Sequence, residues 1–213
     1  GLVLAPMAYG GTALLRGLAA FPLVTPLIHA DSTVQVVAAD DVAEAVLRSL
    51  APGAPLRTVV DLVDAEPVRL RQLVARLRQW LGLPAAPPLE LPVVLVRGIA
   101  RICDALAYAG WRSPMRTTSL QQLQHGVQGD AEAAPSLLGF RPKPLEHMLA
   151  AWPAGVQERW FAKSYFLKPA CLAVLGAFWL SSGLVSLVLR RPEASAVLTQ
   201  SGLPAWLATS AVV

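Results

Sequence analysis

Residues 169–189, PACLAVLGAFWLSSGLVSLVL, decide the character of the C-terminal part of the chain because they form a run of 21 residues without a charge. A helix rises about 1.5 Å per residue, so this run spans roughly 30 Å, the thickness of a bilayer's hydrocarbon core. Arg190 and Arg191 end it, and aromatic residues between Gln157 and Lys168 suit the interface between water and lipid. The sequence predicts one membrane-spanning helix, since the alternative, a buried core helix, is usually shorter and carries a polar face.

Both ends of the chain are apolar. Residues 1–6 look like the middle of a buried strand and lack an initiating Met, while residues 203–213 look like the start of a second membrane span. We therefore expect both ends to be cut from a longer protein, whose N-terminal half is missing. Three positive charges precede the span and two follow it, which favours a cytoplasmic N-terminal region at the inner, or cytoplasmic, membrane.

Composition narrows the class of protein. Of 213 residues, 54% are hydrophobic and 15% charged, against about 45–50% and about 25% in ordinary soluble domains. The net charge of +4 is spread over the chain, so nucleic acid is not an expected partner. Cys103 and Cys171 are expected to be unpaired, buried thiols in a reducing compartment. The three histidines are far apart in sequence, so no metal site is predicted.

Hydrophobic spacing before the span predicts an α/β region. Strands are expected at 2–4, 34–37 and 58–63, and helices at 12–21, 41–50, 70–81, 95–106, 117–127 and 145–151. Residues 9–11 are expected to form a turn, and 22–32 and 84–92 to be irregular. Asp41 is expected to cap its helix, with Asp40 as a substitute cap. Asp64 and Glu66 are expected to complement the dipole of the helix at 70–81, whose arginines form a solvated face.

Several segments carry a resemblance to a known family. LAPMAYG at 4–10 resembles the strand-to-loop segment of atypical and extended short-chain dehydrogenases, the NAD-dependent epimerase/dehydratase-like proteins. VQVVAADDVAEA at 34–45 resembles a second segment of that family, and 58–82 its following strand, turn and leucine–arginine helix. QERWFAK at 157–163, YFLKP at 165–169 and WLSSGLVSL at 179–187 resemble a DoxX-like membrane module that some of these dehydrogenases carry.

The resemblance implies three parts. Residues 1–150 would be the C-terminal part of a Rossmann-like dehydrogenase domain, 151–168 an interfacial linker and 169–213 the start of the DoxX-like module. The family implies NAD or NADP as cofactor, held by a G-x-x-G-x-x-G loop that opens a helix after a strand, and a Tyr-x-x-x-Lys pair for proton transfer. Neither motif occurs in this chain, so no catalytic residue is carried over.

The loop after the first strand supplies the only site residues that the resemblance implies. Pro6, Met7 and Ala8 would contact the nicotinamide, mainly through backbone, and Tyr9 and Gly10 would lie on the substrate side. A half-buried packing role is the alternative for Tyr9. The family usually has Arg where Ala5 stands, and the loop here is one residue shorter.

Three functions remain open for the sequence. The first is a fragment, inactive by itself, of a membrane-attached NAD(P)-dependent oxidoreductase or epimerase that acts on a small-molecule substrate. The second is a non-catalytic subunit or assembly factor of a membrane respiratory complex that keeps the nucleotide-binding fold. The third is a quinone-associated membrane module of the DoxX-like kind. All three have the lipid bilayer as a partner.

Overall fold

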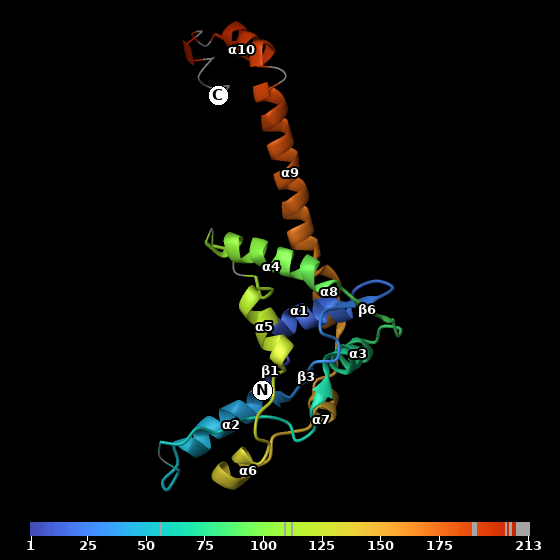
Figure 1. Cartoon of the computed structure of the whole chain (residues 1–213), viewed down its shortest axis with the longest axis vertical. Helices are drawn as coiled ribbons and strands as arrows, with labels where there is room; N and C mark the ends of the chain where they lie inside the picture. Colours follow the sequence, from blue (N-terminus) through green and yellow to red (C-terminus); the bar gives the residue numbers. More distant parts are fainter. Residues whose placement is uncertain are drawn as a thin grey trace. The chain divides into compact units, whose positions relative to one another are not determined.

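The computed structural model describes residues 1–55, 57–108, 110–111, 113–188, 191–202, 204 and 206–207. They divide into two compact units, Gly1–Tyr165 and Phe166–Val213. The N-terminal unit combines short strands with helices, and the C-terminal unit is helical in its described part (Figure 1). The protein is therefore mixed α/β, as its hydrophobic spacing predicts.

Short strands in the N-terminal unit associate in pairs. They are β1 (Leu2–Leu4), β2 (Thr25–Leu27), β3 (Thr33–Val34), β4 (Val36–Ala38), β5 (Val68–Arg69) and β6 (Pro88–Glu90). β1 runs parallel to β4, with Leu2 opposite Val36, and β2 runs parallel to β6. β3 and β5 are antiparallel. β1 and β4 confirm two of the predicted strands, and each leads into a helix.

The predicted strand at 58–63 is wrong. This segment forms no ladder, although the N–H of Asp64, just beyond it, donates to the carbonyl of Val36 at 2.7 Å. Its Val59 side chain is 89% exposed, whereas β-branched residues favour strands mainly on a half-buried surface. Conversely, β2 and β6 occupy segments expected to be irregular. Pro26 and Pro88 are tolerated there because both strands of a two-stranded pair are edge strands.

Eight helices are described in the N-terminal unit, and six of them correspond to predicted ones. They are α1 (Gly10–Ala19), α2 (Ala39–Ser49), α3 (Leu70–Trp80), α4 (Val93–Tyr108), α5 (Thr117–His125), α6 (Ala133–Leu138), α7 (Leu145–Ala151) and α8 (Val156–Ser164). α6 was not expected, and α8 lies in the segment expected to be a linker. α1 and α2 each begin two residues before their predicted start.

The hydrophobic core lies where α3 meets α1 and the short strands. Leu73, Val74 and Leu77 of α3 are fully buried, together with Met148 of α7. Arg78 is also buried, which contradicts a wholly solvated arginine face. Its guanidinium donates to the carbonyls of Ala19, Phe21 and Pro84 at 2.7, 2.8 and 2.5 Å. One arginine of α3 is therefore buried and hydrogen-bonds three backbone carbonyls inside the core.

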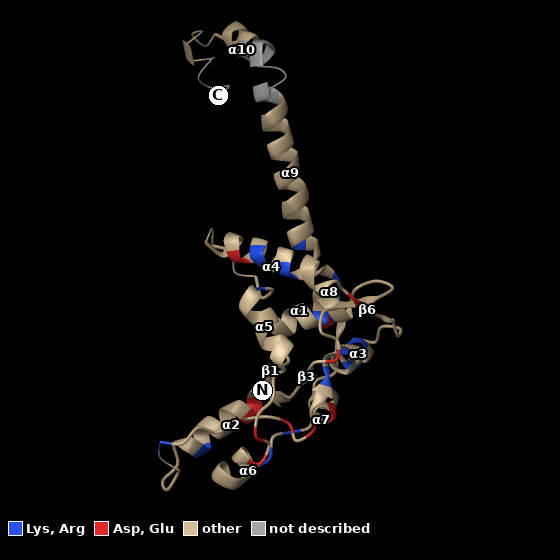
Figure 2. Cartoon of the chain, viewed as in Figure 1, with Lys and Arg blue, Asp and Glu red and all other residues tan. Residues whose placement is uncertain are grey.

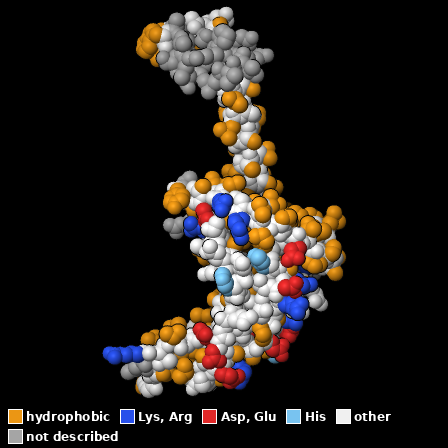
Figure 3. Space-filling model, in the orientation of Figure 1, with side chains coloured by type: hydrophobic (Ala, Val, Ile, Leu, Met, Phe, Trp, Pro, Cys, Tyr) orange, Lys and Arg blue, Asp and Glu red, His pale blue; other side chains and the backbone are white. Residues whose placement is uncertain are grey.

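α4 differs from α3 because most of its apolar side chains face outward. Only Val96 and Ala100 of this helix are buried. Figure 3 shows hydrophobic side chains gathered over α4, with basic side chains beside them. The helix is joined to α5 by Asp104, which accepts from the Arg116 Nε at 3.0 Å and the Thr117 hydroxyl at 2.6 Å.

The C-terminal unit contains α9 (Leu167–Val188) and α10 (Arg191–Gln200). Among the described residues, one helical segment, Val156–Val185, is long and apolar enough to cross a membrane, with a mean hydropathy of 1.4 over 18 residues that are not buried. Beyond its first turn, α9 carries no acidic or basic residue (Figure 2). A helix of spanning length and composition is thus present, and the buried core helix finds no support.

Other expectations for the C-terminal unit have mixed outcomes. α9 begins two residues before the predicted start of the span, whose predicted last residue, Leu189, lies outside the described residues. The expected second span from 203 also lies outside them, apart from Pro204, Trp206 and Leu207. Cys171 in α9 is exposed and Cys103 in α4 is half-buried, so the expected burial of both thiols is wrong, although both are free.

Candidate functional site

The loop that follows β1 carries the five predicted site residues, and they do not form one cluster. Met7 and Tyr9 are 83% and 89% exposed, so the packing alternative for Tyr9 is wrong. Pro6 is exposed and Ala8 is partly buried. The Tyr9 backbone begins α1, because its carbonyl accepts from the Thr12 hydroxyl at 2.8 Å. The loop therefore presents two large side chains to solvent while its backbone is anchored.

Arg16 of α1 anchors this loop through hydrogen bonds to its backbone. Its guanidinium donates to the carbonyls of Ala5 at 2.6 Å and Pro6 at 2.9 Å, and its carbon Cζ lies 4.7 Å from the centre of the Trp80 ring. Burial lowers the pKa of the Arg16 guanidinium, and the charge of Glu158 opposes that shift. Arg16 therefore stabilises the loop conformation. This role was not predicted, because the hydrophobic spacing indicates that Arg16 lies in a helix but not which groups its side chain contacts.

Gly10 and Gly11 form the first residues of α1, so the predicted turn at 9–11 is wrong. Two glycines do open a helix after a strand here, although their spacing is not the dinucleotide-binding pattern. Gly10 has a φ of +54°, which glycine adopts without strain. A Cβ atom added to either glycine would meet no atom within 4 Å, so open space lies beside the start of the helix.

An apolar cavity of about 440 Å³ adjoins the start of α1. This volume lies within the range of small-molecule sites, about 300–1,000 Å³. Its lining includes Gly10 and Gly11 together with Leu14, Val96 and Met115, and the polar side chains in it are those of Ser119 and Gln122. Among the five predicted residues, Gly10 alone is part of this lining.

A smaller, more polar cavity of about 220 Å³ lies next to the apolar one, and the two share Ile28 and Leu120 in their walls. Arg97 and Arg101 of α4 and Gln121 of α5 contribute to its wall. The two cavities together combine an apolar chamber with a basic, amide-rich neighbour. Such a combination suits a ligand that has an apolar body and a polar or anionic group.

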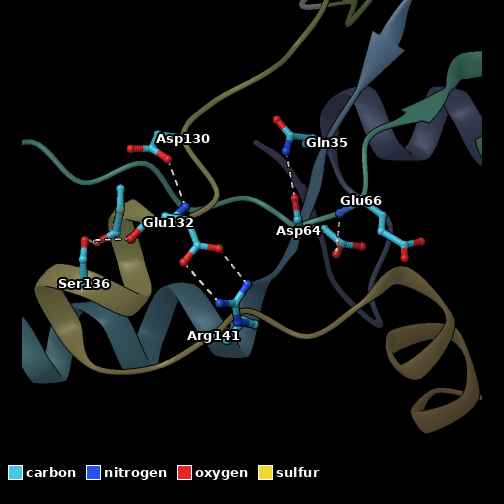
Figure 4. A network of polar contacts seen from close by, with 8 residues as sticks. Gln35, Asp64, Glu66, Asp130, Glu132, Ser136 and Arg141 are labelled. Atoms are coloured by element: carbon cyan, nitrogen blue, oxygen red, sulfur yellow. Dashed lines mark hydrogen bonds and ion pairs between the residues drawn. The ribbon is translucent and has the colours of Figure 1, made fainter.

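Acidic residues away from the cavities have structural partners. Asp64 is buried, and its carboxylate accepts from the Leu145 N–H at 2.9 Å. It also accepts from the Glu66 N–H at 3.3 Å (Figure 4). Gln35 donates to the Asp64 carbonyl at 2.8 Å. Leu145 is the first residue of α7, so Asp64 complements the start of that helix. The prediction that Asp64 complements the start of α3 is therefore wrong.

Asp41 is also a structural residue, but not the predicted cap. β4 leads directly into α2, so the cap position is Ala38 and Asp41 lies inside the first turn. Its buried carboxylate accepts from the Lys143 N–H at 2.7 Å and lies 3.4 Å from the Lys143 Nζ. Asp40 is exposed and does not replace it as the cap.

The remaining acids of this region are likewise occupied. The Glu132 carboxylate accepts two bonds from Arg141, at 2.9 and 3.2 Å, and Asp130 accepts from the Glu132 N–H at 2.9 Å (Figure 4). Among the described residues, no group of three or more His, Cys, Asp or Glu side chains could hold a metal ion. The acidic cluster of Figure 4 therefore serves the fold.

Comparison with known proteins adds no family to these observations. No protein-family model matches the chain, and no curated protein matches it.

Proposed function

We propose that this chain is the membrane-attached, substrate-side part of an NAD(P)-dependent oxidoreductase or epimerase of the extended short-chain dehydrogenase type. In this proposal, residues 1–150 belong to a Rossmann-like domain and α9 attaches that domain to a bilayer. The chain would complete a nucleotide site that it does not form alone. The resemblance of 4–10 and 34–45 to that family motivates the assignment.

The observation that carries the proposal is the loop between β1 and α1. It follows the carboxyl end of a parallel strand, where open α/β sheets bind their ligands. It leads into a helix that opens on two glycines, and Gly10 borders the apolar cavity. A loop in this position can bring a cofactor beside a substrate held in that cavity.

In this proposal, the loop residues contact one edge of a nicotinamide. Arg16 already engages the carbonyls of Ala5 and Pro6, so the loop shape is preorganised and Met7 and Ala8 are left to contact the ring. A bound nucleotide would supply the hydride. The cavity would hold the apolar part of the substrate, and Gln122 and Ser119 are the side chains in its wall that can orient a polar group.

A non-catalytic role in a membrane assembly is the second candidate. It is favoured by the character of the larger cavity, whose lining is mostly Leu, Ile, Val, Met and Pro. Acid–base catalysis requires a titratable group within hydrogen-bond reach of the substrate. A lining of this composition is better suited to holding an apolar group than to transferring its protons.

Nucleotide titration tests the proposal. The complete product of the gene and the 213-residue chain would each be purified in mild detergent and titrated with NADH and NADPH. We expect saturable binding by the complete product and none by the 213-residue chain. Ala8→Phe in the complete product should weaken binding at least tenfold, whereas Ala54→Phe, in a loop outside the site, should not change it.

The outcomes separate the alternatives. Failure of the complete product to bind either nucleotide would overturn the assignment, and tight binding by the 213-residue chain would contradict its dependence on the rest of the protein. Nucleotide binding without turnover of any sugar-nucleotide or carbonyl substrate would favour the non-catalytic candidate. Membrane attachment is tested separately, because release of the chain by alkaline carbonate would contradict it.

A further inference from the structure

The smaller cavity lies between α4 and α5, within the N-terminal unit. Arg97 and Arg101 are one turn apart on α4, and both line this cavity. On α5, residues at helical spacing line it from the other helix: Thr117, Gln121 and Gln124. The apolar stripe of α4 lies on the opposite side of that helix and consists of Leu95, Ile99, Ile102 and Leu106. The two arginines therefore belong to the cavity and not to the stripe.

Both arginines carry a positive charge that no acidic group of the cavity balances. Among the described residues, the cavity wall includes no Asp or Glu, and its third titratable side chain is that of His29. Neither Arg97 nor Arg101 forms an ion pair or a hydrogen bond with a residue that the structure describes. The Arg116 guanidinium, just before α5, differs because it pairs with Asp104 at 3.0 Å. Two guanidiniums in one wall are thus left available to an anion.

The acids close in sequence to this wall are already occupied. Asp104 also accepts from the Thr117 hydroxyl, at 2.6 Å, so its carboxylate is held at the junction of α4 and α5. Asp31, in the loop before β3, forms ion pairs with Arg69 and Arg71. These two acids therefore do not neutralise the positive charge of the cavity wall.

The apolar cavity beside this wall indicates what else the anion carries. The two cavities share Ile28 and Leu120, so a group bound at the arginines lies beside the apolar cavity. Apart from Ser119 and Gln122, the side chains of the larger lining are Leu, Ile, Val, Met and Pro. A sugar there would bury hydroxyl groups without enough partners, whereas a hydrocarbon chain is stabilised by burial. Positive charge on one side and apolar surface on the other fit an amphiphile.

We propose that Arg97 and Arg101 bind the phosphate group of a phosphate monoester whose hydrocarbon chain occupies the apolar cavity. Arginine donates paired N–H groups to phosphate oxygens, and a phosphate monoester carries a charge of roughly −1.5 to −2 at pH 7, which two guanidiniums balance. Gln121 and Gln124 supply further amide donors. The inference rests on the proposed use of the apolar cavity as a ligand site, although the phosphate contact requires no nucleotide.

Titration calorimetry with three small probes tests the site. The complete product of the gene, in a neutral detergent, would be titrated with hexyl phosphate, inorganic phosphate and hexanol, with the detergent alone as the blank. We expect hexyl phosphate to bind at least tenfold more tightly than either of the others. Inorganic phosphate lacks the chain, of which each buried methylene contributes roughly fourfold in affinity, and hexanol lacks the charged head. Equal affinity for hexyl phosphate and either of the other probes would overturn the inference.

Removal of the two guanidiniums tests the phosphate contact. Arg97→Gln with Arg101→Gln should weaken binding of hexyl phosphate at least tenfold and leave that of hexanol unchanged, because only hexyl phosphate carries a charge. Both side chains are exposed, and circular dichroism verifies that the variant is folded. Arg57→Gln, which removes an exposed arginine outside both cavities, is the matched control. Equal affinities in the double variant and the control would overturn the inference.

Filling of the apolar cavity tests the position of the chain. Gly11 lines that cavity, and a Cβ atom there would meet nothing within 4 Å, so Gly11→Leu has room for its side chain. We expect it to weaken binding of hexyl phosphate at least fivefold while inorganic phosphate binds as before. Gly98→Leu is the control, because Gly98 in α4 has the same open surroundings and lies outside both cavities. Unchanged binding of hexyl phosphate by Gly11→Leu would contradict the placement of the chain.

A parallel titration with NADH separates this inference from the nucleotide assignment. Binding of hexyl phosphate without binding of NADH would support the phosphate site and reject only the nucleotide assignment. Binding of NADH without binding of hexyl phosphate would overturn the phosphate site alone.

Discussion

α3 and α4 carry the same sequence pattern and have opposite surroundings. Both have large aliphatic residues at helical spacing on one side and arginines largely on the other. The stripe of α3 is the centre of the core, whereas the stripe of α4 faces outward. Periodicity thus predicts a helix and its apolar side, but not what covers that side. The hydrophobic core covers the stripe of α3, whereas the stripe of α4 is exposed in the part of the chain that the structure describes.

Truncating the centre of each stripe should give the largest difference. Leu73→Ala removes a fully buried side chain from α3, and we expect it to lower the free energy of unfolding by about 2–5 kcal/mol. Leu95→Ala in α4 should change it by less than about 0.5 kcal/mol in detergent. Chemical unfolding followed by circular dichroism measures both. Equal losses would mean that the α4 stripe is packed in the folded protein.

The arginines of the two helices give the next contrast. Arg78→Gln in α3 leaves three carbonyls without their donor, so we expect a loss of about 2–3 kcal/mol. Arg97→Gln in α4 should be neutral within about 0.5 kcal/mol in the same detergent. Thermal unfolding of the two variants measures the difference. A neutral Arg78→Gln would show that water replaces the guanidinium at those carbonyls.

Asp64 lies outside both stripes, and its buried carboxylate tests how much a polar contact in the core contributes to stability. Asp64→Asn replaces one acceptor oxygen by a donor beside the Leu145 or Glu66 N–H, so we expect a loss of about 1–2 kcal/mol. Asp40→Asn is the control, since that side chain is exposed. Unfolding in denaturant should separate the two variants. Similar midpoints would reject the assignment of Asp64 to the start of α7.

The smallest effect should come from the acid that joins α4 to α5. Hydrogen bonds from the Thr117 hydroxyl and the Arg116 guanidinium hold the pKa of Asp104 below its ordinary value. A lowered pKa means that the stabilisation is complete above the ordinary pKa and is lost as the pH falls through the lowered one. The melting temperature should therefore fall slightly less with acidification in Asp104→Asn than in the native chain. Parallel curves would show that this contact does not stabilise the fold.

Sequence reasoning found the elements with strong local patterns. The spacing of α3, α4 and α7 and the short apolar run of β1 were sufficient to locate them. β2 and β6 were missed because each contains a proline, and the tolerance of an edge strand for proline depends on its pairing. The outward direction of Tyr9 and the carbonyls held by Arg16 also depend on tertiary contacts. Of the five site residues expected from the resemblance, only Gly10 lines the apolar cavity.

Buried side chains in the first part of the N-terminal unit hydrogen-bond residues that are synthesised much later. Asp41, Gln35 and Asp64 bond to residues 102, 94 and 81 positions later, in the segment from Gly129 to Leu145. Their buried groups stay without those partners until that segment has left the ribosome. The apolar helix α9 begins only about twenty residues after Leu145. Because long-range contacts form late, the N-terminal unit completes its fold only while the apolar helix is about to emerge from the ribosome.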